Sequence, residues 1–271
     1  WKNLMQQRNS SADISPTAGQ MPRLVGLAQA SKVYRENKEL SATDLAKNFT
    51  NNGNEVAFGT IGDASTSEGP FWESINAAGV MQIPLVMSVW DDGYGISVPR
   101  EFQTTKGSIS EALSGMQRTA DKKGYEIFVT KGWDYVHLCQ TYEKAVRLAR
   151  EEHVPVLIHV KEVNQPQGHS TSGSHERYKS KERLEWEKEY DCIEKFKEWI
   201  LAFNASGNKI ADQKTLENIH KEAKAMVRTS KNNSWKKYTS EIQQELEEVS
   251  TLIEAAAQSS SEKQFILKEL E

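Results

Sequence analysis

The sequence predicts an α/β protein built on a doubly wound parallel sheet with helices on both faces, followed by a helical C-terminal extension. Two observations carry this prediction. Short apolar runs alternate with longer segments of helical spacing through the first two thirds of the chain, which is the pattern of βαβ units. From about Asp191 onward no segment has strand character, and the sequence is polar with helical spacing. We therefore expect an α/β domain over 1–204 and a helical extension or linker over 205–271.

Each element is predicted from apolar spacing and from the positions of proline and glycine. In chain order, the first elements are a helix over 21–35, a polar loop over 36–54, a strand over 55–61, a helix over 69–82 and a strand over 83–90. The pattern then repeats as a helix over 108–124, a strand over 125–130, a helix over 135–153 and a strand over 154–163. Pro22 and Pro70 stand in first turns, where proline is tolerated, and Gly124 is expected to close its helix. One or two polar amphipathic helices are expected over 231–271.

Composition excludes several classes of protein. The chain has 271 residues, a net charge of −4 and a mean hydropathy of −0.66, so it offers no basic surface for nucleic acid. No apolar run reaches the ~18 residues of a membrane span. Only Cys139 and Cys192 are present, too few for a disulfide framework, and we expect a reducing, cytoplasmic compartment.

The candidate site lies in three loops that follow predicted strands. Ligands of doubly wound sheets bind outside the carboxyl ends of the strands, and a parallel sheet brings these ends to one edge. The loops 62–67, 91–95 and 167–174 should therefore meet there. This gives Asp63, Asp92 and His169 a common neighbourhood.

These residue types have clear chemical uses and equally plain structural ones. Asp63 and Asp92 are hard oxygen ligands suited to Mg²⁺ or Ca²⁺, and His169 can donate to an anion or move a proton. Three hydroxyl residues, 65–67, precede a helix whose N-terminus favours phosphate. Asp and Gly are also ordinary turn residues, and a loop histidine is often only solvated. The remaining histidines are taken as structural or exposed: His137, His153, His159 and His175.

Four segments together resemble a known family over about residues 11–204, namely the α-subunits of thiamine-diphosphate-dependent 2-oxoacid dehydrogenases. The first is SPTAGQMPRLVGLAQASK (15–32), and the second, GDASTSEGPFWESINAAGVMQIPLV (62–86), resembles the cofactor motif. DDGYGISVP (91–99) stands where the family usually has Asn-Asn-Gly-Tyr-Ala-Ile-Ser. GHSTSGSHERYK (168–179) resembles its histidine-bearing loop.

The resemblance implies the thiamine-diphosphate-binding fold and a site for Mg²⁺ and thiamine diphosphate. Its metal ligands would be the carboxylates of Asp63 and Asp92 and the backbone carbonyl of Tyr94. Further contacts would come from Gly62, Ala64 and Ser65 at the diphosphate, from Ser15 and Thr17 at the aminopyrimidine ring, and from His169 as the candidate catalytic residue near the reacting centre.

The implied activity is the oxidative decarboxylation of a 2-oxoacid with acyl transfer to a lipoyl group on a partner acyltransferase. The activating glutamate would come from a β-subunit or a fused β-like half, since no second α/β domain is predicted here, and the chain should be inactive alone. The Gly-His-Ser-Thr-Ser loop favours a branched-chain type over a pyruvate type. Two alternatives stay open: a transketolase-type or acetoin-type enzyme, and a non-catalytic, cofactor-free subunit of the same fold.

Departures from the family pattern concern charge. Gly-Asp-Ala replaces Gly-Asp-Gly, and Asp91-Asp92 replaces an asparagine pair. Trp90 and Gln165 stand where the family often has arginines. The site thus gains carboxylate charge and loses cations, and uncompensated charge at low dielectric is costly. We expect weaker or more metal-demanding cofactor binding than in the family.

Overall fold

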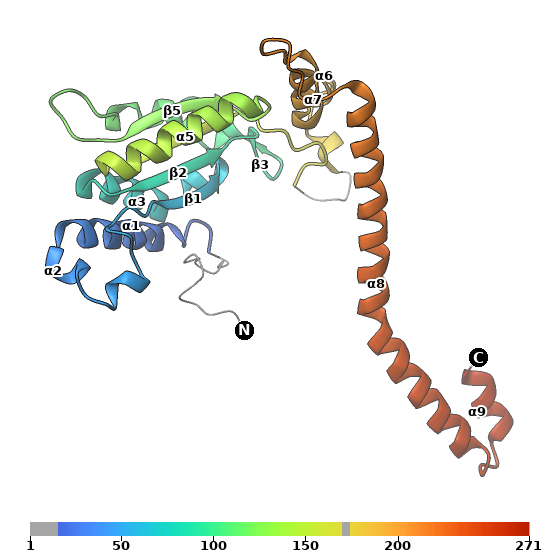
Figure 1. The fold of residues 1–271 in the computed structure, drawn as a ribbon. Helices are drawn as coiled ribbons and strands as arrows, with labels where there is room; N and C mark the ends of the chain where they lie inside the picture. The colour runs from blue at the N-terminus through green and yellow to red at the C-terminus, as the bar shows by residue number, and fades with distance from the viewer. Residues whose placement is uncertain (1–15, 170–173, 271) are drawn as a thin grey trace. The chain divides into compact units, whose positions relative to one another are not determined.

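The computed structural model describes residues 16–169 and 174–270, including the first predicted helix but not Ser15 (Figure 1). The chain separates into two compact units, Trp1–Trp199 and Ile200–Glu271. The boundary between 204 and 205 suggested by the sequence stays a prediction. Among the described residues, no helix is long and apolar enough to cross a membrane.

A four-stranded parallel sheet forms the centre of the first unit, as predicted. Its strands, in spatial order, are β1 (Ala57–Gly62), β2 (Leu85–Trp90), β6 (Val156–Lys161) and β5 (Glu126–Lys131). The register sets Gly62 opposite Trp90, and Trp90 opposite Val160. The carboxyl ends of the three strands β1, β2 and β6 are therefore level with one another. A short antiparallel hairpin, β3 (Tyr94–Gly95) and β4 (Val98–Pro99), follows β2.

Helices cover both faces of this sheet, which confirms the doubly wound prediction. Helices α1 (Met21–Glu36) and α3 (Gly69–Met81) pack together on one face, and α5 (Tyr135–Glu152) lies along the other (Figure 1). Successive residues of β2 point to opposite sides, so Leu85 joins the cluster beneath α1 and α3 while Val86 joins the cluster beneath α5. Strands β2 and β6 are buried on both faces, which explains their continuous apolar sequence.

The predicted helix over 108–124 is wrong. It is limited to α4 (Ile109–Ala112), with a 3₁₀ turn at Ser114–Met116 after it. The Tyr125 N–H donates to the Met116 carbonyl and the Arg118 N–H donates to the Tyr125 carbonyl, each at 2.8 Å. These bonds occupy the Met116 carbonyl and the Arg118 N–H, which would otherwise form the i to i+4 hydrogen bonds of a continuing helix. A Cβ at Gly124 would lie 2.4 Å from the Met116 carbonyl oxygen, so glycine permits this close approach rather than ending a helix.

The remaining elements are short turns and the C-terminal helices. The predicted loop over 36–54 contains α2 (Lys38–Ser41) and a 3₁₀ turn at Ala46–Asn48. Further 3₁₀ turns lie at Ala64–Ser67, Arg100–Phe102, Thr105–Gly107 and Ser174–Arg177. The C-terminal helices are α6 (Lys181–Glu189), α7 (Cys192–Ala202), α8 (Gln213–Ala257) and α9 (Lys263–Leu270). The Asp212 carboxylate accepts from the Thr215 N–H at 2.8 Å and so caps the N-terminus of α8.

Candidate functional site

The site is built where β1 and β2 end at the same edge of the sheet. The Asp63 N–H donates to the Trp90 carbonyl at 3.1 Å, and the Asp91 N–H donates to the Val160 carbonyl at 2.9 Å. The backbone ladder thus continues one residue past each strand. This fixes Asp63 and Asp91 in the same layer, with Asp92 next in the chain, as expected from the rule on strand ends.

Asp63 has a buried carboxyl group whose hydrogen-bonding capacity is only partly satisfied. It receives a backbone hydrogen bond from Ala64, but its Oδ2 atom is buried and has no hydrogen-bond partner among the described residues. Burial, with the nearby carboxylates of Asp91 and Asp92, raises the pKa of Asp63 to about 7. The Asp63 carbonyl accepts from the Thr66 N–H and hydroxyl, which turns the Thr66 side chain inward. A cation beside Oδ2 would satisfy this group.

Asp91 is also buried, and two donors reach its Oδ2 atom, whereas its Oδ1 atom has no partner among the described residues. Its Oδ2 accepts from Arg100 Nη1 at 3.0 Å and from His159 Nε2 at 2.9 Å. Burial acts to raise the pKa of Asp91, but the His159 hydrogen bond and the Arg100 charge outweigh it and hold the pKa below its ordinary value. The other nitrogen of the fully buried His159 bonds to the Ser110 hydroxyl at 2.8 Å. Asp91 therefore anchors the loop as an anion.

Asp92 and Tyr94 form a tight turn, and Arg183 on α6 donates a hydrogen bond to its backbone. The Asp92 Oδ1 atom accepts from the Tyr94 N–H at 3.1 Å, and Gly93 between them has a φ of 86°, which glycine adopts without strain. The Asp92 carbonyl accepts from Arg183 Nη2 at 2.9 Å. Burial raises the pKa of Asp92, opposed by the Tyr94 N–H and by the charges of Lys179 and Arg183.

A buried ion cluster supports this turn. Lys179 Nζ contacts Glu187 Oε1 at 2.7 Å, and Arg183 Nε contacts the same oxygen at 3.0 Å. Lys179 also donates to the Gln165 carbonyl at 2.8 Å, and both cations lie over the Tyr94 ring at 5.7 Å. Positions 90 and 165 hold Trp and Gln, but the charges of Lys179 and Arg183 act on Asp92 in the acidic loop.

Sequence reasoning missed the residues that complete these contacts: Ser110, Arg100, His159, Lys179 and Arg183. His159 was taken as structural, which agrees with its burial, but its bond to Asp91 was not foreseen. Arg100 reaches Asp91 because the Arg100 N–H donates to the Gly93 carbonyl at 3.0 Å and turns the hairpin back. A basic residue shortly after the Asp-Asp pair was the one local signal that could have suggested this contact.

The other predicted site residues are placed as follows. Gly62 is open: a Cβ there would find no atom nearer than the Ser65 hydroxyl at 3.9 Å. Thr17 is exposed, and Ala64 and Ser65 are half-buried beside Asp63. His169 is exposed, and in the described part of the chain no hydrogen bond or ion pair joins it to the carboxylates. Ser15 lies outside the described residues.

The donor set suits a hard cation that brings ligands of its own. Within 16–169 and 174–270, no group of three or more His, Cys, Asp or Glu side chains could hold a metal ion. Magnesium commonly takes one or two protein carboxylates and fills its shell with water and phosphate oxygens. Asp63 with its unpartnered Oδ2 and Asp92 beside it fit that demand, and the open backbone at Gly62 leaves space for a ligand.

Comparison with known proteins fits this geometry. A family model described as "Dehydrogenase E1 component" matches residues 3–243. The chain belongs to this E1 family. The resemblance found in the four motifs is thereby confirmed at the family level. The E1 chain is 28% identical over 186 residues to the pyruvate dehydrogenase E1 component subunit alpha of Rickettsia bellii, covering 68% of this chain and 53% of the relative.

Two Bacillus subtilis relatives have names that specify other substrates. The subunit alpha of acetoin:2,6-dichlorophenolindophenol oxidoreductase is 30% identical over 164 residues, covering 59% of this chain and 46% of the relative. The subunit alpha of 2-oxoisovalerate dehydrogenase is 27% identical over 179 residues, covering 66% and 47%. This E1 chain spans about half the length of the curated relatives it matches.

Proposed function

We propose that this E1 chain supplies the diphosphate-binding half of a thiamine-diphosphate- and Mg²⁺-dependent site for oxidative decarboxylation of a 2-oxoacid. The observation that carries the proposal is the buried, unpartnered Oδ2 of Asp63 at the sheet edge, with Asp92 beside it. When bound, thiamine diphosphate would supply a nucleophilic carbon that adds to the substrate's carbonyl group and a ring that accepts the electron pair left behind when carbon dioxide departs. The family membership and the α-subunit relatives support this choice of cofactor.

The chain's own residues then have distinct tasks. Asp63 and Asp92 would hold Mg²⁺ through their carboxylates and Tyr94 through its carbonyl. Gly62, with Ala64 and Ser65, would admit the diphosphate close to the backbone at the start of the turn that leads into α3.

Three further residues complete the proposed assignment. Ser15 and Thr17 would contact the aminopyrimidine ring. His169 would donate to the diphosphate or substrate near the reacting centre. These three assignments rest on the family motifs.

The proposed partners follow from the family, because the relatives are named as alpha subunits. A β-subunit or fused β-like half would carry the activating glutamate, and a lipoyl-bearing acyltransferase would accept the acyl group. We place the protein in the cytoplasm, because its two cysteines are both free and suit a reducing compartment. The substrate would be a branched-chain 2-oxoacid or pyruvate, and the acetoin relative makes acetoin the competing substrate to include in any assay.

Calorimetric titration of thiamine diphosphate, with and without Mg²⁺, into the chain assembled with its β-like partner tests the proposal. Binding should require Mg²⁺ and should be lost in Asp63→Ala and Asp92→Ala. Glu143→Gln, an exposed change on α5, is the matched control and should bind as the parent does. Tight binding without any metal would refute the metal assignment. Absence of binding with every metal would show a fold that has lost its cofactor.

A further inference from the structure

Three acidic side chains are buried in the part of the chain that the structure describes: Asp63, Asp91 and Glu187. Each has one oxygen without a partner among the described residues. A buried oxygen without a partner is costly, because it has lost its water and gained no contact in return. The other oxygen of Glu187 contacts two cations, Lys179 and Arg183. Asp63 and Asp91 differ from Glu187 in lying next to each other.

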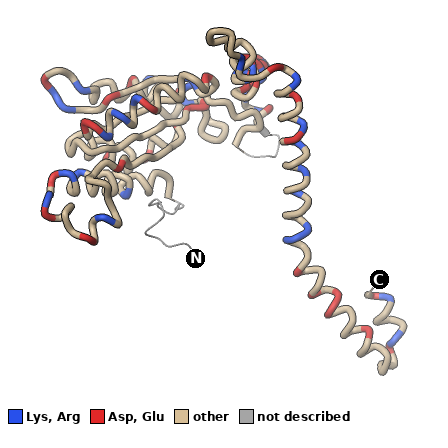
Figure 2. Tube along the Cα trace, viewed as in Figure 1, with Lys and Arg blue, Asp and Glu red and all other residues tan. Residues whose placement is uncertain are grey.

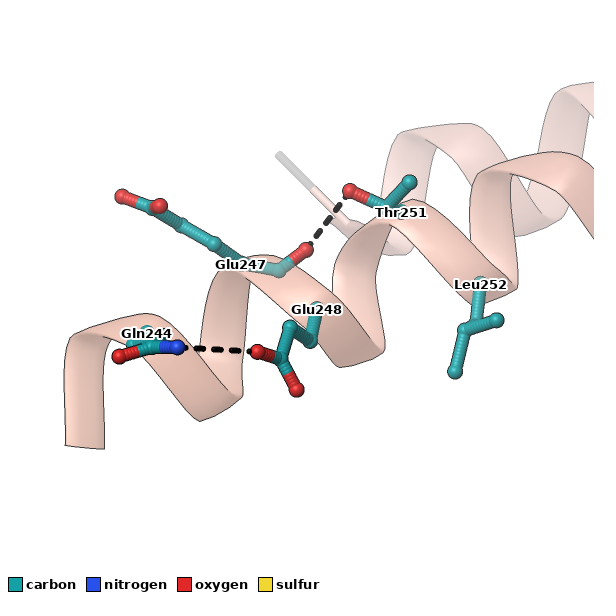
Figure 3. A pocket seen from close by; sticks show the side chains of 5 residues that line it. All are labelled: Gln244, Glu247, Glu248, Thr251 and Leu252. Carbon is teal, nitrogen blue, oxygen red and sulfur yellow. Dashed lines mark hydrogen bonds between the residues drawn. The ribbon is translucent and has the colours of Figure 1, made fainter. Parts of the chain in front are cut away.

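The acidic residues of α8 show the opposite situation. Residues 238–257 contain five Glu and no Lys or Arg, so the later part of this helix is acidic (Figure 2). An open hollow there is lined by Gln244, Glu247, Glu248, Thr251 and Leu252, and it lies along one helix surface (Figure 3). Glu247 and Glu248 are exposed, and Gln244 Nε2 donates to Glu248 Oε1 at 3.2 Å. Water satisfies such carboxylates, so their number alone does not make a cation site.

The carboxyl groups of Asp63 and Asp91 meet at the ends of β1 and β2. Backbone hydrogen bonds hold the two residues in one layer of the sheet edge, and the two carboxyl groups are close enough for a direct contact. Asp63 is 5% exposed and Asp91 is 2% exposed. As anions, both groups can only accept hydrogen bonds, so neither satisfies the other. A divalent cation between them would satisfy both.

The orientation of Asp91 is fixed by the contacts of its Oδ2 atom. This oxygen accepts from Arg100 Nη1 at 3.0 Å and from His159 Nε2 at 2.9 Å. The fully buried His159 ring is held in turn by the Ser110 hydroxyl, on α4, at 2.8 Å from its Nδ1 atom. Because a carboxylate only accepts, the hydrogen of this contact is on His159 Nε2. With Oδ2 occupied by two donors, Oδ1 is the oxygen left for a further ligand.

We propose that Asp91 Oδ1 and Asp63 Oδ2 bind the cation together, and that His159 is the residue that positions Asp91 for this. The proposal rests on the cation site at Asp63 in the proposed function and adds Asp91 to its ligands. Magnesium is usually bound by one or two protein carboxylates together with substrate phosphates. Two adjacent buried anionic oxygens supply more of the binding from the protein. The chain should therefore bind a divalent cation before thiamine diphosphate is present.

Titration of Mn²⁺ into the full 271-residue chain, without thiamine diphosphate, tests the proposal. Mn²⁺ accepts the same oxygen ligands as Mg²⁺, and the electron paramagnetic resonance signal of the free ion measures binding. The parent should bind Mn²⁺ with a Kd below about 1 mM, and Mg²⁺ should displace it. Asp91→Asn should weaken binding about tenfold or more, because an anionic ligand becomes neutral. Asp121→Asn, the same change at an exposed position before β5, is the matched control.

Urea unfolding without metal separates a ligand from an anchor. In Asp91→Asn the amide oxygen must take the place of Oδ2, since Arg100 and His159 are both donors there. The amide nitrogen then takes the place of Oδ1 and donates to Asp63 Oδ2, which satisfies that atom. The metal-free variant should therefore have a urea midpoint at or above that of the parent. If Asp91 served only as an anchor, the midpoint would fall and Mn²⁺ binding would stay unchanged.

His159→Phe tests the positioning role. Asp91 then keeps Arg100 alone, so Mn²⁺ binding should weaken, but by less than in Asp91→Asn. In the double variant the histidine change should cause no further loss, because His159 acts through Asp91. Equal losses from His159→Phe with and without Asp91 would contradict that role.

Two results would overturn the proposal as a whole: unchanged Mn²⁺ affinity in Asp91→Asn, or a parent that leaves Mn²⁺ free up to about 1 mM. If thiamine diphosphate still binds with Mg²⁺ in the assembled protein, the proposed function survives either result. Conversely, Mn²⁺ binding that depends on Asp63 and Asp91, in an assembled protein that binds no thiamine diphosphate, would support this inference and refute the proposed function.

Discussion

Removal of the Glu187 charge gives the sharpest test of how the acidic turn is supported. Glu187 on α6 is 2% exposed, as is the Lys179 side chain that it binds at 2.7 Å. In Glu187→Gln, the Lys179 ammonium keeps the Gln165 carbonyl at 2.8 Å but loses its buried counter-charge. Arg183 is less affected, because its side chain is 24% exposed and also donates to the Asp92 carbonyl.

The expected loss of stability follows from these contacts. Removing one member of a buried ion pair costs about 3–5 kcal/mol, because the remaining charge is left without compensation. The glutamine oxygen still accepts one hydrogen bond, so we expect the lower end, about 3 kcal/mol. Against a total stability of ~5–15 kcal/mol this is large. With a urea m-value of ~1–3 kcal/mol per molar, the unfolding midpoint should fall by about 1–3 M.

Urea unfolding followed by tryptophan fluorescence measures this change. Glu189→Gln, exposed on the same helix, is the control and should lose less than about 0.5 kcal/mol. The double variant Lys179→Met, Glu187→Leu should recover most of the loss, since an apolar pair removes both desolvation costs. A loss below about 1 kcal/mol in Glu187→Gln would mean that water screens the pair and that the cluster does not hold the turn.

Three further predictions concern the site edge and a strained loop. Burial and the neighbouring carboxylates raise the pKa of Asp63 to about 7 from an unfolded value near 3.8, so the folded, metal-free chain holds a proton that the unfolded chain releases. The free energy of unfolding should therefore decrease as pH rises from about 4 to about 7. Urea unfolding across this range should show a smaller decrease in Asp63→Asn than in the parent. Equal pH dependence of the unfolding free energy in the two proteins would contradict this. Gly62→Ala should leave the melting temperature unchanged but weaken thiamine diphosphate binding about tenfold or more, because the methyl group occupies the space at the backbone. Gly115→Ala, where a Cβ would meet no atom within 4 Å, is its calorimetric control, and equal affinities would remove Gly62 from the diphosphate site. Lys106 has a φ of 62°, so Lys106→Gly should stabilise the chain by about 1 kcal/mol in thermal unfolding, and a lower midpoint would refute this reading of strain.

The sheet could be predicted because its sequence signals are local. Strands β2 and β6 lie in the centre of the sheet, and their continuous apolar runs report burial on both faces. For the segment 108–124 the same reasoning gave a wrong helix. There, backbone hydrogen bonds between residues 116–118 and Tyr125 replace the hydrogen bonds that a helix would form. Such pairing depends on where a distant strand brings the chain, and periodicity in a window cannot report it.

The site likewise contains residues that could be predicted from the sequence and supporting residues that could not. Asp63 and Asp92 could be placed because each follows a strand, and the topology of a parallel sheet brings strand ends together. Arg183 reaches the Asp92 carbonyl from 91 residues away, and His159 reaches Asp91 from 68 residues away. No spacing rule connects such pairs, so the supporting contacts came only from the folded chain.

The Asp91-Asp92 pair shows how this changes the electrostatic argument. From the sequence, a second carboxylate next to a metal ligand looks like uncompensated charge. In the fold, Arg100 and His159 hold Asp91 as an anion, and that fixed negative charge, after burial itself, helps raise the pKa of Asp63. The unpartnered Oδ2 of Asp63 therefore carries much of this electrostatic cost, and Asp91 Oδ1 is likewise buried without a partner among the described residues. A divalent cation at Asp63 Oδ2 would remove the cost that Asp91 imposes, so the extra carboxylate favours metal binding, provided that the metal is present.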